Sequence, residues 1–223
     1  MAMQNLLQNN TVAPDAEIIA KILAGEPALY EVLIRRYNPV IYKIARGYGF
    51  NHQDAEDLMQ ETLVAAYNSL HQFSFRASFK TWLSKIMIHK CLYKLNHGAG
   101  HKETTPGETV LYENKSAEHA SAASPEQLTM NKEFAAILDK ALQSISVNYR
   151  EVFLLREVEG FSVAETADLL QISAVNVKVR LNRAKAMLQK QLEQFYPVSA
   201  LYDFHAVYCD AMVRRVFNRM FES

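Results

Sequence analysis

The sequence predicts an all-α protein built from two helical domains. Apolar residues recur at helical spacing through most of the 223 residues, and no segment shows the alternation typical of a strand. A stretch rich in Gly, Ser, Thr, Ala and Pro interrupts this pattern near the middle, which favours two small domains over one large one. We expect the domains at 15–96 and 126–196, joined by a flexible linker at 97–125 and followed by a helical tail at 199–223.

Four helices account for the first domain. Gly25 suits the left-handed position after the first helix, and Pro27 suits the first turn of the second. Pro39 is expected to kink that second helix, because a proline removes one backbone hydrogen bond. The remaining two helices are expected at about residues 52–70, capped by Asn51, and at about residues 79–95, capped by Ser78.

The second domain contains a helix-turn-helix pattern. Ser162 and Glu165 have the spacing of a capping box, in which each side chain accepts a hydrogen bond from a free amide at the start of a helix. A helix of about eight residues follows, then a turn at 171–173 and a second helix that stops before Pro197. A short helix, a tight turn and a long helix are typical of DNA-binding domains.

Composition excludes several classes of protein. With 49% hydrophobic and 22% charged residues, the chain is neither disordered nor a disulfide scaffold. Its two widely spaced cysteines suit the cytoplasm, and its longest apolar runs, of five residues, are far below the roughly 20 needed for membrane insertion. Because 24 basic residues balance 24 acidic ones, any claim of nucleic-acid binding depends on where charges cluster.

Basic residues cluster on two helices. The segment from Ala174 to Lys190 contains no acid, so it could enter a major groove or simply be a solvated basic face. Its opposite face has an apolar stripe of Val177, Leu181, Ala184 and Leu188. Its cations are Lys178, Arg180, Arg183, Lys185 and Lys190. The segment from Arg76 to Lys94 also lacks acids, and aromatic residues lie at its start. Flat rings beside cations suit single-stranded bases, but the same rings could equally form a core.

The third predicted helix is acidic. Asp54, Glu56, Asp57 and Glu61 all lie in its first ten residues, where the helix dipole favours negative charge. The dipole does not account for Glu61, almost three turns in, so an acidic patch for a basic partner is the alternative.

No catalytic site is expected. His52 and Glu56 have i, i+4 spacing, but a metal site needs three or four ligands and no neighbour completes one. His205 and Cys209, in the tail, are likewise too few. We therefore expect no metal, no cofactor and no enzyme activity, although a helical enzyme using His52 and Glu56 remains a third hypothesis.

Several motifs, in one order, resemble those of bacterial extracytoplasmic-function (ECF) sigma factors, which keep only regions 2 and 4 of the sigma-70 family. Three segments resemble region 2, namely RYNPVIYKIARGYG, DAEDLMQETLVAAYNSLHQF and FRASFKTWLSKIMIHKCLYKL. One segment resembles region 4, namely SISVNYREVFLLREVEGFSVAETADLLQISAVNVKVRLNRAKAML. Together these segments cover about two thirds of the chain. The resemblance implies a transcription initiation factor that binds core RNA polymerase, through the largest-subunit clamp helices and the flap, and promoter DNA, with an anti-sigma factor as a further potential partner.

The resemblance also implies roles for residues. Docking on the clamp helices is implied for Asp57, Gln60 and Glu61. Melting of the minus-ten element and binding of its single strand are implied for Phe75, Arg76, Phe79, Trp82, Lys85 and His89. Contacts to the duplex minus-thirty-five element are implied for Asn176, Lys178, Arg180, Arg183 and Lys185.

Some residues depart from the family pattern. His89 replaces a usual Asn near the single-strand pocket, Gln171 and Val175 replace frequent glycines, and Asn176 replaces a usual Thr. The tail lies outside both regions and is expected to pack on the protein or on a regulator. Its apolar stripe consists of Phe204, Tyr208, Met212, Val216 and Met220. The alternative function is a stand-alone helix-turn-helix regulator, which would need neither the acidic helix nor the aromatic basic segment.

Overall fold

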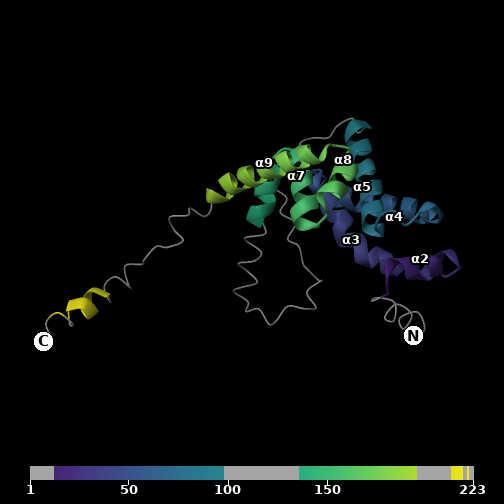
Figure 1. Ribbon diagram of the computed structural model, residues 1–223, viewed down its shortest axis with the longest axis horizontal. Coiled ribbons are helices and arrows are strands. Elements are labelled where there is room, and N and C mark those ends of the chain that lie inside the picture. Colours follow the sequence, from purple (N-terminus) through teal and green to yellow (C-terminus); the bar gives the residue numbers. More distant parts are fainter. Residues whose placement is uncertain (1–12, 98–135, 195–211, 218–219, 221–223) are drawn as a thin grey trace.

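Every regular element that the structure describes is helical, which confirms the predicted fold class (Figure 1). The structure is a computed structural model, and it describes residues 13–97, 136–194, 212–217 and 220. The predicted linker therefore lies outside the described residues, apart from His97, which ends a helix. Within the described residues, no helix is both long and apolar enough to cross a membrane.

The first domain contains the four expected helices. They are α2 (Asp15–Leu23), α3 (Tyr30–Gly47), α4 (His52–Asn68) and α5 (Phe79–His97), with short 3-10 turns η1 (Pro27–Leu29) and η2 (Leu70–Gln72). Two predicted caps are present, since the Asp54 amide donates to the Asn51 side chain at 2.8 Å and the Thr81 amide donates to the Ser78 hydroxyl at 3.0 Å. Gly25 has φ +109°, as its place after a helix requires.

Helices α3, α4 and α5 pack on one another around a core of large aliphatic side chains. Leu33 and Ile41 come from α3, Leu58 from α4, and Leu83 and Ile88 from α5, and all five are almost fully buried. Leu33 and Ile41 are eight residues apart, which places both on the face of α3 that is turned to the core. Helix α3 runs through Pro39 without a break, so the proline does not divide it.

The second domain contains the predicted helix-turn-helix. Helical residues 136–144 precede α7 (Val147–Phe153), the π-helical turn η3 (Leu154–Val158), α8 (Val163–Leu170) and α9 (Ala174–Glu193). The capping box is complete, because Ser162 and Glu165 each accept a hydrogen bond from the other's amide, at 3.1 Å and 2.8 Å. Gln171 takes the left-handed conformation at φ +53°, although glycine would adopt it at lower cost.

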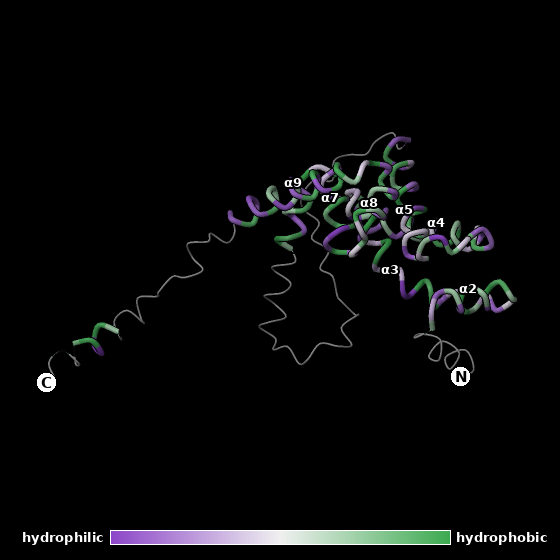
Figure 2. Tube along the Cα trace, viewed as in Figure 1, coloured by the Kyte–Doolittle hydropathy of each residue, from purple (hydrophilic) through white to green (hydrophobic). Residues whose placement is uncertain are grey.

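The two domains are in contact, with α8 lying beside α5 (Figure 1). Leu155, Phe161 and Leu169 of the second domain belong to the same buried cluster as the core of the first. Figure 2 shows hydrophobic and hydrophilic residues alternating along these helices, as expected for helices with one face against a core. The sequence predicted tethered modules but not this contact.

The described part of the tail is helical at 212–217. Met212, Val216 and Met220, three members of its predicted apolar stripe, are exposed. The expectation that this stripe packs on the protein itself is therefore wrong for these three side chains. The other two members, Phe204 and Tyr208, lie outside the described residues.

Candidate nucleic-acid and protein interfaces

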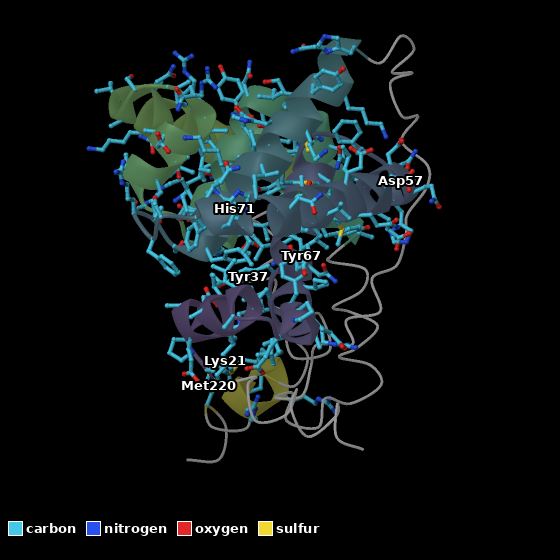
Figure 3. All side chains as sticks on the ribbon, turned by 90° about the vertical axis from the view of Figure 1, so that its right-hand side faces the viewer. Lys21, Tyr37, Asp57, Tyr67, His71 and Met220 are labelled. Carbon is cyan, nitrogen blue, oxygen red and sulfur yellow. The ribbon has the colours of Figure 1, made fainter. Side chains whose placement is uncertain are left out.

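The predicted acidic surface lies on the outer side of α4. Asp57, Gln60 and Glu61 are all exposed, and Asp57 projects from α4 at the edge of the molecule in Figure 3. Glu61 has 62% of its side chain exposed, and its carboxylate lies 3.1 Å from the ammonium of Lys90 on α5. All three side chains can therefore reach a partner without any change in the core.

Two apolar residues extend this acidic surface, and the sequence analysis missed them. Val64 is 61% exposed and Tyr67 is 41% exposed. They follow Gln60 and Glu61 by about one and two turns, so they lie on the same side of α4. The helical spacing of Asp57, Glu61 and Val64 was a signal that could have found them. Acidic groups beside exposed apolar groups are typical of a protein-docking surface.

The predicted single-strand site contains a cluster of rings. Phe73 contacts Phe75 and Trp82, with ring centroids 4.7 Å and 5.2 Å apart, and Phe79 contacts Trp82 at 5.6 Å. Phe75 is 53% exposed and has φ +58°, a conformation that is rare outside glycine and is often kept at binding sites. Trp82 is half-buried against the core.

The structure corrects one member of this site. Phe79 is only 2% exposed and belongs to the core cluster, so its ring has no free face on which a base could stack in this conformation. It supports the rings of Trp82 and Tyr37 instead. Arg76 and His89 are exposed, as a role in DNA binding requires. Lys85 is half-buried, and its ammonium lies 3.1 Å from the carboxylate of Asp168 on α8.

The predicted duplex-binding residues lie along α9. Lys178, Arg183 and Lys185 are exposed, and Asn176 is partly exposed in the first turn. The buried face of α9 is formed by Val177, Ala184 and Leu188, which confirms the predicted apolar stripe except that Leu181 is only partly buried. The cations therefore face away from the core, as a helix that enters a groove requires.

Three cations on α9 have acceptors within the second domain. Arg180 lies 3.4 Å from Glu151, and Lys185 lies 3.0 Å from Glu157. Arg183 donates to the Tyr149 hydroxyl at 3.4 Å. Arg180 is thus less available to DNA than the sequence suggested.

Glu151 is a buried acid that the sequence analysis missed. Burial raises its pKa, while the Tyr48 hydroxyl and Arg180 act in the opposite direction by favouring the carboxylate. Tyr48 belongs to the first domain, and burial together with the charge of Glu151 raises the pKa of its hydroxyl. Glu151 is therefore a buried acid whose ion-pair partner is Arg180 of the helix-turn-helix.

The hypothesis of a metal site finds no complete set of ligands. His52 lies 3.4 Å from Glu56, and its other ring nitrogen pairs with the Tyr42 hydroxyl at 2.9 Å. Among the described residues, no group of three or more His, Cys, Asp or Glu side chains could hold a metal ion.

Comparison with known proteins decides the family. The profile of Sigma-70 region 2 matches residues 33–99, and that of Sigma-70, region 4 matches residues 135–188. The ECF RNA polymerase sigma factor SigM of Mycobacterium tuberculosis is 28% identical over 178 residues, which cover 80% of this chain and 84% of SigM. This chain belongs to the sigma-70 family as an ECF sigma factor. The RNA polymerase sigma-H factor of Pseudomonas aeruginosa is 26% identical to it over 188 residues, which cover 82% of this sigma factor and 96% of that protein.

Two solved structures share the fold. CnrH, in complex with the cytosolic domain of CnrY, has a TM-score of 0.56 and 23% identity, and covers 81% of this sigma factor and 97% of its own chain. The sigma factor RpoE from Bartonella quintana, in complex with the anti-sigma factor NepR, has a TM-score of 0.55 and 22% identity over 74% of this sigma factor and 96% of its own chain. The acidic and aromatic surfaces lie in the matched region 2, and the basic helix lies in the matched region 4.

Proposed function

We propose that this sigma factor divides its work among three surfaces. Sigma factors direct promoter-specific transcription initiation by binding core RNA polymerase and promoter DNA, and this function belongs to the chain through its family. The proposal assigns polymerase to the outer side of α4, the melted minus-ten strand to the start of α5, and the duplex minus-thirty-five element to α9. It also places the protein in the cytoplasm, where polymerase and chromosome lie.

The exposure of the acidic surface carries this proposal. Acids that served only the helix dipole would concentrate in the first turn, whereas Glu61 lies far beyond it and is well exposed beside Val64. A basic and partly apolar partner fits this surface, and we assign to it the clamp helices of the polymerase largest subunit. Contact with the polymerase flap is proposed for the second domain, with no single residue assigned.

The single-strand site combines an exposed ring with cations. Phe75 offers a face for stacking, and Arg76, Lys85 and His89 lie near enough in sequence to line the path of the phosphates. Trp82 is half-buried, so we propose that it forms the wall of a pocket for a flipped base rather than an open platform.

On α9, exposed cations supply affinity for the duplex through phosphate contacts. We assign this role to Lys178, Arg183 and Lys185, and we assign base contacts to the first two turns, which begin at Asn176. Arg180 is proposed to position the helix through Glu151 as well as to contact DNA.

An anti-sigma factor is a further proposed partner. RpoE, which shares the fold, is solved in complex with the anti-sigma factor NepR, and we propose that a protein of this kind regulates the present chain.

Promoter opening distinguishes a sigma factor from the alternative, a stand-alone regulator, because only the sigma factor is expected to open promoters together with polymerase. A promoter found by run-off sequencing would carry 2-aminopurine on the non-template strand of its minus-ten element. We expect fluorescence to rise only when both the protein and core polymerase are present, because melting needs both. Tight duplex binding by the protein alone, with no fluorescence increase when polymerase is added, would instead support the regulator.

A further inference from the structure

The second domain has a small apolar core of its own, separate from the core that it shares with the first domain. Its buried members are Ala141, Ile145, Ala184 and Leu188, and two of these four are alanines. The larger side chains around them are only partly buried, namely Leu142, Tyr149, Phe153 and Leu192. Within the described residues, apolar surface at this end of the domain therefore stays in contact with water, which costs stability.

A groove lies beside this small core. It has a volume of about 380 Å³, and its walls come from residues 136–144, α7 and the second half of α9. Its apolar lining is supplied by Leu138, Phe153, Leu188 and Leu192, and Glu193 also lines it. The profile of region 4 ends at residue 188, so most of the α9 wall lies at or beyond the end of the matched region.

The sequence that follows α9 has the composition of a segment that packs rather than that of a linker. Residues 195–211 contain five aromatic residues in 17 positions, whereas aromatic residues make up 10% of the whole chain. Among Asp, Glu, Lys and Arg, the segment contains only Asp203 and Asp210. A flexible linker is typically rich in glycine, serine or charge instead. Burial of the aromatic rings would therefore stabilise the protein, because each ring carries a large apolar surface.

This aromatic segment starts next to the groove. Glu193 lines the groove, and the segment begins two positions further along the chain. Pro197 cannot donate the backbone hydrogen bond of a continued helix, so the sequence favours a change of chain direction there. Ten extended residues reach about 33 Å, whereas α9 between Leu188 and Glu193 is only about 8 Å long. Phe204 can therefore reach every part of the groove from the end of α9.

We propose that the segment 195–211 docks in this groove in cis, with aromatic side chains against Leu138, Phe153 and Leu192. The occupant is the protein's own tail, because a segment attached beside the groove has a roughly millimolar effective concentration, which a second copy or a separate protein does not reach. Docking completes the small core of the second domain and fixes the end of α9. The exposed side chains of Met212 and Val216 lie beyond the docked segment. The inference is independent of the proposed roles in binding polymerase and DNA.

Photo-crosslinking in the full chain tests the contact. The photoreactive amino acid p-benzoylphenylalanine is incorporated in place of Phe204, the protein is irradiated at low concentration, and mass spectrometry identifies the cross-linked peptides. We expect cross-links within one chain to residues 136–153 or 188–193. The same amino acid in place of Val216, which is exposed beyond the segment, should give few of these cross-links.

A substitution in the groove provides a second measurement. Leu192→Asp places a charge in the apolar wall and should lower the yield of the cross-link from position 204 about tenfold, because the segment would have to bury that charge. The control Gln194→Asp adds the same charge two residues further on, at an exposed position, and should leave the yield unchanged. Circular dichroism establishes that both variants are folded.

Hydrogen exchange measures the effect of the tail on the small core. The variant Leu201→Ser/Phe204→Ser/Tyr208→Ser removes apolar side chains from the segment. Amides in 136–144 and 188–193 should then exchange about tenfold faster, because local opening becomes easier. The control Met212→Ser/Val216→Ser/Met220→Ser makes the same kind of change at exposed residues of the tail and should leave these rates unchanged. Exchange in α4 should be equal in both variants and the parent.

Any other outcome overturns the inference. Cross-links mainly between two chains would assign the groove to a second copy, and cross-links to the first domain, or none at all, would show that the segment does not occupy it. A cross-link yield that is unaffected by Leu192→Asp would show that the apolar wall does not hold the segment. Equal exchange rates in the two triple variants would show that the segment does not complete the small core.

Discussion

Glu61 is the residue on which the proposed docking of polymerase depends most directly. It is exposed on the acidic side of α4, and its carboxylate pairs with the partly buried Lys90 of α5. We expect Glu61→Lys to abolish co-purification with core polymerase, because the substitution reverses the charge that faces a basic partner. The helical content by circular dichroism should be unchanged, since the side chain contributes nothing to the core.

Glu31→Lys is the matched control for this change. Glu31 is an acid on α3 that pairs with Arg35 one turn away, so the substitution makes the same charge change and removes the same kind of pair. It should co-purify with polymerase as well as the parent protein does. Equal retention of Glu61→Lys and Glu31→Lys would contradict the docking role of α4.

Lys178 and Arg180 should differ in their effects. Lys178 is exposed, so Lys178→Ala should weaken duplex binding and reduce the slope of log affinity against log salt by about one, with no loss of stability. Arg180→Ala should also lower the free energy of unfolding, by about 1 to 3 kcal/mol, because it leaves the buried Glu151 without its cation. Salt titrations of binding and urea unfolding measure both quantities. Identical stability of the two variants would show that the Arg180 contact with Glu151 contributes nothing.

Two valines at the start of α9 have no role in the core. Val175 is 70% exposed and Val179 is 41% exposed, one turn apart and on either side of Lys178. Apolar side chains in a major groove contact the methyl group of thymine. We therefore expect replacement of thymine by uracil at one or two positions of the minus-thirty-five element to weaken binding, and Val175→Ser to remove most of that difference. A binding constant that is insensitive to uracil at every position would contradict this role.

At the residue scale, the sequence predicted exposure better than burial. Asp57 and Glu61 on α4 and Lys178 on α9 are exposed as predicted, because a charged side chain rarely enters a core without a partner. Phe79 was misassigned because an aromatic residue at helical spacing has the same pattern in a core and in a binding site. Glu151 was missed because only its three-dimensional neighbours distinguish a buried acid from an exposed one.

At the scale of elements, α8 depends on its capping box. Ser162→Ala should lower the free energy of unfolding by about 1 kcal/mol, because an amide at the helix start loses its acceptor. Bonds from the Ser162 amide and hydroxyl lower the pKa of Glu165. At a pH above the ordinary pKa of a glutamate, the ionised Glu165 therefore stabilises the folded state. This stabilisation is lost as the pH falls through the lowered pKa of Glu165.

The pH dependence of this cap has a direct check. Glu165→Gln keeps a side-chain acceptor but cannot ionise. Its free energy of unfolding, measured with urea at neutral and at acid pH, should therefore decrease less on acidification than that of the parent. The control Glu193→Gln should follow the parent. Parallel pH profiles for the parent and Glu165→Gln would show that ionisation of Glu165 contributes nothing.

Most elements could be predicted within two residues, because their ends carry local signals. Asn51, Ser78 and Ser162 all act as caps where the sequence indicates them. Gln171 is the exception to simple rules, since it takes the left-handed position usually given to glycine, yet the turn still forms where the short helix was expected to end.

At the scale of the whole molecule, the contact between the domains could not be predicted. Lys43 and Glu159 are 116 positions apart, and no periodic pattern connects residues at such a separation. Glu159 and Asp168 also resemble ordinary solvated charge when the sequence is considered alone. Only the fold brings Glu159 to Lys80, so a cation of the first domain pairs with an acid of the second.

The central claim is that this chain directs core RNA polymerase to promoters through α4, and run-off transcription tests it most directly. Purified protein and core polymerase are incubated with native promoter fragments and nucleotides. We expect a discrete run-off product that requires both proteins, that is lost with Glu61→Lys, and that is retained with Glu31→Lys. Absence of a product on every native promoter, or an undiminished product with Glu61→Lys, would contradict the account.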